Sequence, residues 1–227
     1  MSRSPFPPIP ERLPETLAVF PLAGVMLLPR CRLPLNIFEP RYLAMVGDAL
    51  AGDRMIGMIQ PADPAARGTA PALYGTGCAG RITGFSETDD GRFLITLTGV
   101  SRFTVVREVE GVCGYRRVTP AWEGFTADLD PGDPDARGSG AFDRPRLLRG
   151  LKHYLRVQGL SVDWQAIEST PDERLINSLA MICPFVPSEK QALLEAPGLG
   201  DRAKLLIALI EMAILGCRDG DCAAHRH

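Results

Sequence analysis

Four side chains that could bind a metal ion lie together at the end of the chain. Cys217, Cys222, His225 and His227 fall within 11 residues and include two of the three histidines. Zinc binds thiolate and imidazole, but structural sites usually separate two cysteines by two to four residues and two histidines by three to five. Here four residues separate the cysteines and one separates the histidines. These residues are weak metal candidates, and the sequence favours a polar tail with no cofactor.

A glycine-rich hexapeptide, GTGCAG at 75–80, has the spacing of the dinucleotide-binding pattern G-x-G-x-x-G. That pattern binds a pyrophosphate only when a helix follows, because the helix N-terminus supplies the N–H groups. Here the β-rich segment RITGF follows. We therefore predict a strand entry or a bulge at this point and no nucleotide cofactor.

A thiol and an imidazole could also form a hydrolase site. Cys113 is a possible nucleophile, and His153 is the only histidine outside the tail. Such a site needs both side chains and an orienting group to meet in space. The two residues are remote in sequence and neither lies in a local catalytic pattern. The sequence therefore predicts no catalytic residues, although an enzyme of another kind stays as an alternative.

Charge and composition narrow the classes of partner. The chain carries 25 Lys and Arg against 27 Asp and Glu, a net charge of −2, which argues against a nucleic-acid binder. Six cysteines without a secretory signal indicate reduced thiols and a cytoplasmic protein. The longest apolar run, 205–215, contains Glu211 and would form a helix only about 16 Å long. That is about half of a bilayer core, so no membrane partner is predicted.

Strand signals dominate the first half of the chain. Asp90-Gly91 is typical of a hairpin turn, and the apolar residues Phe93, Ile95 and Leu97 alternate after it. Short strands with turn signals at nearly regular spacing predict a small barrel or a strongly bent sheet.

Helical periodicity follows a segment rich in Asp, Gly and Pro. Leu147, Leu151 and Tyr154 share one predicted helix face, and a second face is basic. Such a charged face is usually only solvated, and an acidic partner is the alternative. The basic residues are Arg149, Lys152, His153 and Arg156.

Capping patterns place the later helices. Capping boxes are predicted at 170–173 and 188–191, and Gly216 is predicted to end the last helix. Ile182 is expected on a buried face with Leu175 and Leu179. With strands first and helices after, the fold class is α+β. The predicted parts are an N-terminal tail (1–16), a β-rich domain (17–125), a flexible linker (126–145), a helical bundle (146–216) and a polar tail (217–227).

The transition from strand to helix at LPLNIFEPRY, 33–42, is the most specific local feature. Pro40 suits the first turn of a helix, where its missing N–H has no partner to lose. Glu39 is expected to cap that helix, whose apolar residues Leu43, Val46 and Leu50 recur at helical spacing. Leu35, Ile37 and Phe38 are expected to anchor the helix on the sheet.

Several motifs together resemble one family. FPLAGVMLLP at 20–29, LPLNIFEPRY, GDRMIGMIQP at 52–61 and GRFLITLTGVSRFTVVREVE at 91–110 are similar to the N-terminal, substrate-binding domain of the Lon proteases. The similarity is closer still to free-standing bacterial proteins of this domain. It implies a PUA-like β-rich pseudobarrel followed by a helical bundle. No G-x-x-x-x-G-K-[ST] motif is present, so the expectation is a recognition module without ATPase or protease domains.

The resemblance also implies a function. Lon N-terminal domains recognise unfolded or tagged polypeptides, so we expect a non-catalytic protein- or peptide-binding module. The resemblance further implies a separate protease or chaperone as its partner. The candidate peptide contacts are Phe38, Arg41, Tyr42 and Met45. Because some PUA-like barrels bind RNA, an RNA-binding protein is the alternative, against which the acidic balance argues.

Overall fold

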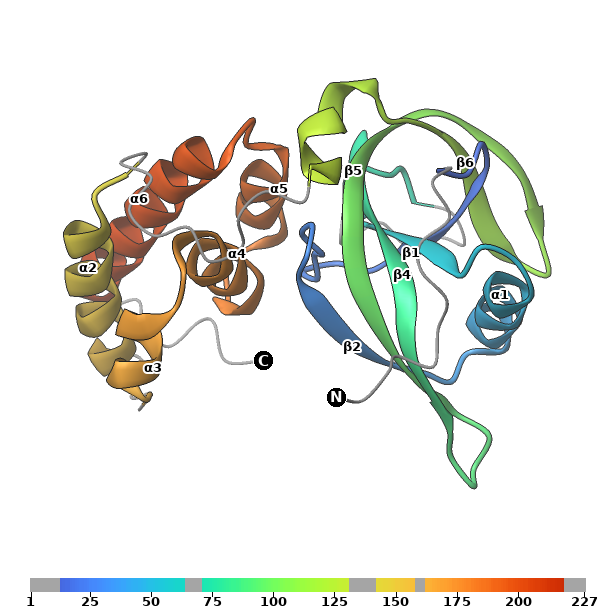
Figure 1. Ribbon diagram of the computed structural model, residues 1–227, viewed down its shortest axis with the longest axis horizontal. Helices are drawn as coiled ribbons and strands as arrows, with labels where there is room; N and C mark the ends of the chain where they lie inside the picture. The colour runs from blue at the N-terminus through green and yellow to red at the C-terminus, as the bar shows by residue number, and fades with distance from the viewer. Residues whose placement is uncertain (1–12, 64–70, 131–141, 158–161, 219–227) are drawn as a thin grey trace. The chain divides into compact units, whose positions relative to one another are not determined.

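The chain divides into a β-rich unit, residues 1–131, and a helical unit, residues 132–227 (Figure 1). The computed structural model describes residues 13–63, 71–130, 142–157 and 162–218. Strands precede helices with little alternation, so the α+β prediction is confirmed.

The elements of the β-rich unit follow the predicted order. They are β1 (Leu17–Pro21), β2 (Arg32–Ile37), α1 (Pro40–Ala51), β3 (Met55–Ile59), β4 (Thr76–Glu87), β5 (Phe93–Val112), β6 (Tyr115–Ala121) and the 3-10 helix η1 (Glu123–Leu129). The turn between β4 and β5 contains Gly91 at φ 78°, as expected for the Asp90-Gly91 hairpin.

Strand β5 closes the sheet because it pairs with different neighbours along its length. The order is β2-β5-β4-β3-β1-β6, and β5 pairs with β6 as well. The first residues of β5 pair with β2, and those from Thr104 onward pair with β6. Only β1 and β3 run parallel. Five strands therefore form a closed ring, the predicted barrel, and β2 lies outside the ring as an edge strand.

Inside the ring, buried side chains from β1, β3, β4, β5 and β6 form one core. Phe103 lies at its centre, fully buried, with Trp122 packed edge-on at a ring distance of 5.8 Å. Its other buried members are Leu17, Val19, Met55, Ile59, Ala79 and Val118.

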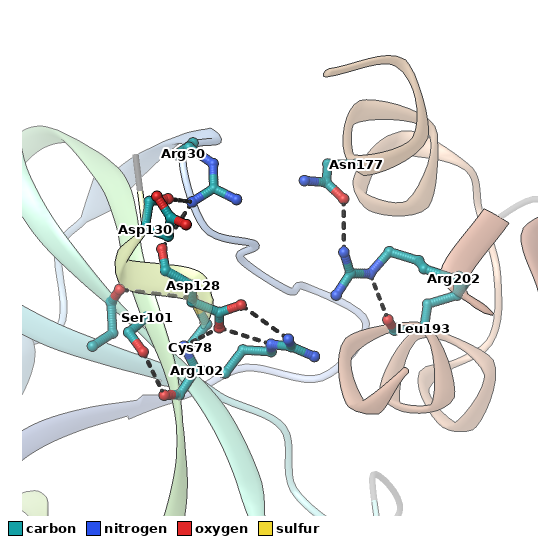
Figure 2. A network of polar contacts seen from close by, with 10 residues as sticks. Arg30, Cys78, Ser101, Arg102, Asp128, Asp130, Asn177, Leu193 and Arg202 are labelled. Atoms are coloured by element: carbon teal, nitrogen blue, oxygen red, sulfur yellow. Dashed lines mark hydrogen bonds and ion pairs between the residues drawn. The ribbon is translucent and has the colours of Figure 1, made fainter. Parts of the chain in front are cut away.

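A buried ion pair fixes η1 to the barrel. The carboxylate of Asp128 accepts hydrogen bonds from Nε of Arg102 at 2.8 Å, from its Nη2 at 2.9 Å and from its backbone N–H at 3.0 Å (Figure 2). The guanidinium of Arg102 also lies 4.6 Å from the ring centre of Phe125. The prediction that the flexible linker starts at residue 126 is therefore wrong. The Asp-rich composition of this segment concealed a carboxylate that pairs with an arginine 26 residues earlier in the chain.

Helix α1 begins at Pro40, as predicted, but its N-cap contact and its set of buried residues differ from the prediction. Glu39 occupies the N-cap position without a side-chain hydrogen bond to the helix, since its carboxylate accepts bonds from Arg41 instead. The residues that α1 buries are Tyr42, Met45, Val46 and Ala49, which are three or four positions apart. Leu43 and Leu50 are only half-buried.

The helical unit contains five described helices, α2 (Arg144–Val157), α3 (Trp164–Ser169), α4 (Asp172–Ile182), α5 (Pro187–Glu195) and α6 (Leu199–Arg218). Leu147, Leu151 and Tyr154 of α2 are buried, as predicted, and α2 packs against α6. No helix in the described parts of the chain is long and apolar enough to cross a membrane.

Four local predictions for this unit are wrong. The capping box at 170–173 is not formed. Thr170 is the C-cap of α3, and the N-cap of α4 is Pro171, whose side chain makes no hydrogen bond to the helix. In α5, Glu189 accepts the N–H of Val186 at 3.0 Å, so the cap lies before the predicted box. Helix α6 continues through Gly216. Ile182 is 77% exposed, because α4 buries Leu175, Ile176 and Ala180 instead.

Buried polar side chains join three helices of this unit. Arg202 of α6 donates to the carbonyl of Leu193 at 2.9 Å and to the Asn177 side chain at 3.0 Å (Figure 2). Lys190 of α5 donates to the carbonyl of Met181 at 3.0 Å, and burial lowers its pKa. These contacts satisfy carbonyls at helix ends, which would otherwise be buried without a partner.

Candidate functional site: an exposed apolar arm

The β4–β5 hairpin projects beyond the ring, with the edge strand β2 beside it (Figure 1). We call this three-stranded extension the arm: β2, residues 83–87 of β4 and residues 93–98 of β5. Residues paired across neighbouring strands point to the same face of a sheet. Pro34, Thr96 and Gly84 therefore share one face, and Asn36, Leu94 and Ser86 form the next row on it.

This face contains a shallow groove of about 490 Å³. Gly84 contributes to the groove by lacking a side chain, since a Cβ there would lie 3.2 Å from Oγ1 of Thr96. Leu94, which lines the groove, is 44% exposed. The groove thus combines an accessible leucine with short polar side chains, an arrangement suited to a ligand that is not fixed by charge.

Exposed aromatic side chains lie on both faces of the arm. Phe38, directly after β2, is 61% exposed, and the guanidinium of Arg92 lies 5.8 Å from its ring centre. Phe85, which pairs with Ile95, lies on the opposite face of the arm, is 40% exposed and contacts Phe93 edge-on at 5.1 Å. Single exposed apolar residues are ordinary, but several in one small region indicate an interaction surface.

The free edge of β2 is poorly suited to pairing with another strand. Gly99 donates its N–H to the carbonyl oxygen of Cys31 at 2.8 Å. In an antiparallel pair, residues that bond the neighbouring strand alternate with residues that do not. The backbone groups of Arg32, Pro34 and Asn36 therefore point away from β5. Pro34 has no N–H to donate at that edge. A ligand of the arm would therefore bind through side chains more than through the backbone.

Of the predicted contact residues, Phe38 is exposed rather than an anchor of the helix. Arg41 is accessible, with 41% of its side chain exposed, and forms an ion pair with Glu39 at 2.9 Å. Its guanidinium also lies 4.5 Å from the centre of the Tyr42 ring. The sequence thus identified two accessible residues: Phe38 follows β2 of the arm, whereas Arg41 lies beside Gly114 in the β5–β6 turn.

The other two predicted contacts are wrong. Tyr42 is 7% exposed and packs its ring 4.3 Å from that of Phe20, and burial raises the pKa of its hydroxyl. Met45 is fully buried. Both face the barrel because Tyr42 starts the buried stripe of α1, one position earlier than the predicted Leu43.

Phe85 and Leu94 were missed. Their sequence signal was visible, since apolar and polar residues alternate on both sides of the Asp90-Gly91 turn. Alternation gives the face of each residue but not whether that face is covered. Only the projection of the hairpin beyond the ring leaves them exposed.

The sequence comparison agrees with the motifs. The sequence model of the ATP-dependent protease La (LON) substrate-binding domain matches residues 16–212. The chain belongs to the Lon substrate-binding domain family. The match covers both the β-rich unit and most of the helical unit, so the family assignment does not depend on the strand-to-helix motif alone.

Curated relatives of this Lon substrate-binding domain are Lon proteases. The chain is 26% identical over 206 residues to Lon protease 2 of Myxococcus xanthus and 24% identical over 208 residues to Lon protease 2 of Sorangium cellulosum. The alignments cover 88% and 90% of the chain. The chain spans about a quarter of each relative's length, 24% and 25%.

Solved structures share the fold. The Lon N-terminal domain protein from Xanthomonas campestris aligns with a TM-score of 0.57 at 23% identity, covering 85% of this chain and 97% of that one. The N-terminal domain of the Mycobacterium avium complex Lon protease aligns with a TM-score of 0.56 at 14% identity, covering 86% and 98%. The predicted PUA-like pseudobarrel with a C-terminal helical part is consistent with both.

The glycine-rich hexapeptide of this Lon substrate-binding domain lies in a strand. Gly77 and Gly80 belong to β4, and the strand register shifts between Ala79 and Gly80, as the predicted bulge requires. A Cβ on Gly77 would lie 2.6 Å from the Phe103 ring and 2.8 Å from the carbonyl oxygen of Met58. The glycine thus serves packing, and the strand leaves no helix N-terminus there for a pyrophosphate.

Replacing Gly77 with alanine should lower the free energy of unfolding by about 2 kcal/mol, because overpacking displaces Phe103 and a strand carbonyl. The matched change Gly75→Ala should have little effect, since nothing lies within 4 Å of that added carbon. Urea unfolding of both variants measures the difference. Equal losses of stability in the two variants would show that overpacking at Gly77 is not the cause.

The remaining chemical candidates lie in different units or outside the described residues. Cys113 is an exposed thiol in the β5–β6 turn, at φ 50°, whereas His153 belongs to helix α2 of the other unit. Of the weak metal candidates, Cys222, His225 and His227 lie outside the described residues, and for Cys217 only the helical backbone is described. Within the described ranges no group of three or more His, Cys, Asp or Glu could hold a metal ion.

Proposed function

We propose that this protein is a non-catalytic module that binds unfolded or tagged polypeptides through the arm. The observation that carries the proposal is the presence of two exposed apolar side chains, Phe38 beside the groove and Leu94 in its lining. Membership of the Lon substrate-binding domain family supports the choice of polypeptide as the ligand.

The chemistry of the arm suits a ligand without a fixed sequence. Burying one leucine or phenylalanine side chain contributes about 1.5–3 kcal/mol, so two or three apolar contacts give weak, reversible binding. The groove offers short polar groups from Asn36, Ser86 and Thr96 rather than a deep specificity pocket. Because Pro34 interrupts the strand edge, extended chains of different sequence can be held without a defined register.

The wider role is part of the same proposal. A module that holds unfolded chains would pass them to a separate protease or chaperone, as the family's name suggests. A cytoplasmic location fits the free thiols of Cys113 and Cys183. Co-purification under native conditions with mass spectrometry would test the partner, and repeated absence of any protease or folding factor would count against this role.

The variant Phe38→Ser/Leu94→Ser should bind a labelled, reduced and carboxymethylated polypeptide at least about tenfold more weakly than the unaltered protein. Loss of one well-buried apolar contact typically lowers binding by about 2 kcal/mol, which exceeds a tenfold change. Fluorescence anisotropy measures the dissociation constant. The unaltered protein should show no ATPase or peptidase activity in parallel assays.

The matched control is Val106→Ser. Val106 is also on β5 and 62% exposed, but it lies outside the arm. The substitution Val106→Ser should leave the dissociation constant for the labelled polypeptide unchanged. An equal loss in the control would show that exposed apolar residues act without regard to position. Absence of binding at high micromolar concentration would refute the proposed function itself.

A further inference from the structure

Helix α2 has six basic residues and no acidic one in the sequence RPRLLRGLKHYLRV. Two of the six have structural partners. Arg144 forms an ion pair with Asp172 and donates to the carbonyl of Thr170 at 2.8 Å. Arg146 binds both carboxylate oxygens of Glu211 at 2.8 Å. These two arginines join α2 to α4 and α6, and the fold accounts for them.

The other four, Arg149, Lys152, His153 and Arg156, form what we call the basic face. They are three, four and seven positions apart, which places them within about 100° of the helix circumference. The buried residues Leu147, Leu151 and Tyr154 lie on the opposite side. The face is therefore directed away from the core of the helical unit.

The basic face is not neutralised within the described parts of the chain. No carboxylate there forms an ion pair with any of its four members, in contrast to Arg144 and Arg146. Cations three or four positions apart on a helix repel one another. The helix dipole stabilises Arg156 in the last turn, but it does not reach Arg149. An anionic partner would remove this repulsion.

We propose that the basic face of α2 is a docking surface for an acidic polypeptide segment. Its charged groups are about one helical turn apart, which matches glutamates three or four positions apart on a partner helix. Trp164 of α3 borders the face, with its ring centre 5.7 Å from the ammonium of Lys152. It supplies an aromatic edge beside the charges. This surface belongs to the helical unit and does not depend on ligand binding by the arm.

A polypeptide fits this surface better than a nucleic acid does. From Arg149 to Arg156 the face extends only about 10 Å along the helix, whereas nucleic-acid sites typically contact about 6–10 phosphates. The net charge of −2 also opposes general attraction of nucleic acid.

The test uses the full chain and a fluorescein-labelled peptide of about 14 residues with glutamate at every third or fourth position. The same peptide with glutamine in place of glutamate is the first control. A single-stranded RNA of similar length is the second. Anisotropy is measured for the unaltered protein, for Arg149→Gln/Lys152→Gln and for Arg174→Gln/Lys204→Gln. The last variant removes the same charge from exposed residues elsewhere in the helical unit.

We expect the glutamate peptide to bind, the glutamine peptide not to bind, and binding to weaken as salt increases. Arg149→Gln/Lys152→Gln should weaken it about tenfold or more, and Arg174→Gln/Lys204→Gln should not. Phe38→Ser/Leu94→Ser should leave it unchanged, which separates this surface from the arm. The proposal is overturned if the glutamate peptide does not bind, if both charge variants lose affinity equally, or if the RNA binds more tightly than the peptide.

Discussion

Replacing Asp128 with alanine is expected to lower the free energy of unfolding of the β-rich unit by about 3–5 kcal/mol. The side chains of Arg102 and Asp128 are only 4% and 8% exposed. Removing the carboxylate takes one acceptor from the buried Arg102 backbone N–H and two charged hydrogen bonds from its buried guanidinium. Arg102 retains its contact with the Phe125 ring, but an aromatic face does not replace a charged acceptor. Helix η1 should separate from the barrel first.

The measurement is urea unfolding followed by the fluorescence of Trp122, which packs on Phe103 in the β-rich unit. The chain has two tryptophans, so Trp164→Phe in all variants leaves one reporter. The control is Glu211→Gln, which breaks the exposed pair with Arg146 and should change little. In Arg102→Met/Asp128→Leu most of the lost stability should return, because no charge remains buried. If Asp128→Ala unfolds like the unaltered protein, η1 is not held by this ion pair.

Gly99→Ala is expected to destabilise the same unit by about 3 kcal/mol or to prevent folding. An added Cβ would lie 2.1 Å from the carbonyl oxygen of Leu28 and 3.1 Å from Cα of Pro29. Both are backbone atoms, which cannot move away as a flexible side chain could. Gly99 also exchanges backbone hydrogen bonds with Arg30 and Cys31, each at 2.8 Å, so any shift would break the start of the β2–β5 ladder. Thermal unfolding and the yield of folded protein measure the effect.

The matched control, Gly47→Ala, should act in the opposite direction. Gly47 is exposed within α1, and nothing lies within 4 Å of its added carbon. Alanine in a helix interior is favoured over glycine by about 0.5–1 kcal/mol, so this variant should unfold at a slightly higher temperature. If Gly99→Ala were as stable as Gly47→Ala, the close approach of Leu28 to β5 would not exist in solution.

Only some residues of the candidate site could be predicted from the sequence. LPLNIFEPRY led to Phe38 and Arg41 because it marks the end of a strand and the start of a helix. It could not show which side of the helix is covered, and Tyr42 and Met45 prove to be core residues. Leu94 is far from Phe38 in the chain and joins it only through the pairing of β2 with β5, and Phe85 reaches the opposite face of the arm through the pairing of β5 with β4.

The sequence by itself determined the local features of this protein. Pro40, the Asp90-Gly91 turn and the alternating apolar residues act through neighbouring backbone geometry, so the strands, the hairpin and the start of α1 could be predicted. Family membership also followed from motifs. The tertiary structure decided which faces are covered: β5 closes the ring, Asp128 meets Arg102, Met45 is buried and Phe38 is exposed. These outcomes depend on contacts between residues far apart in the chain, and no local pattern encodes which distant partner will be present.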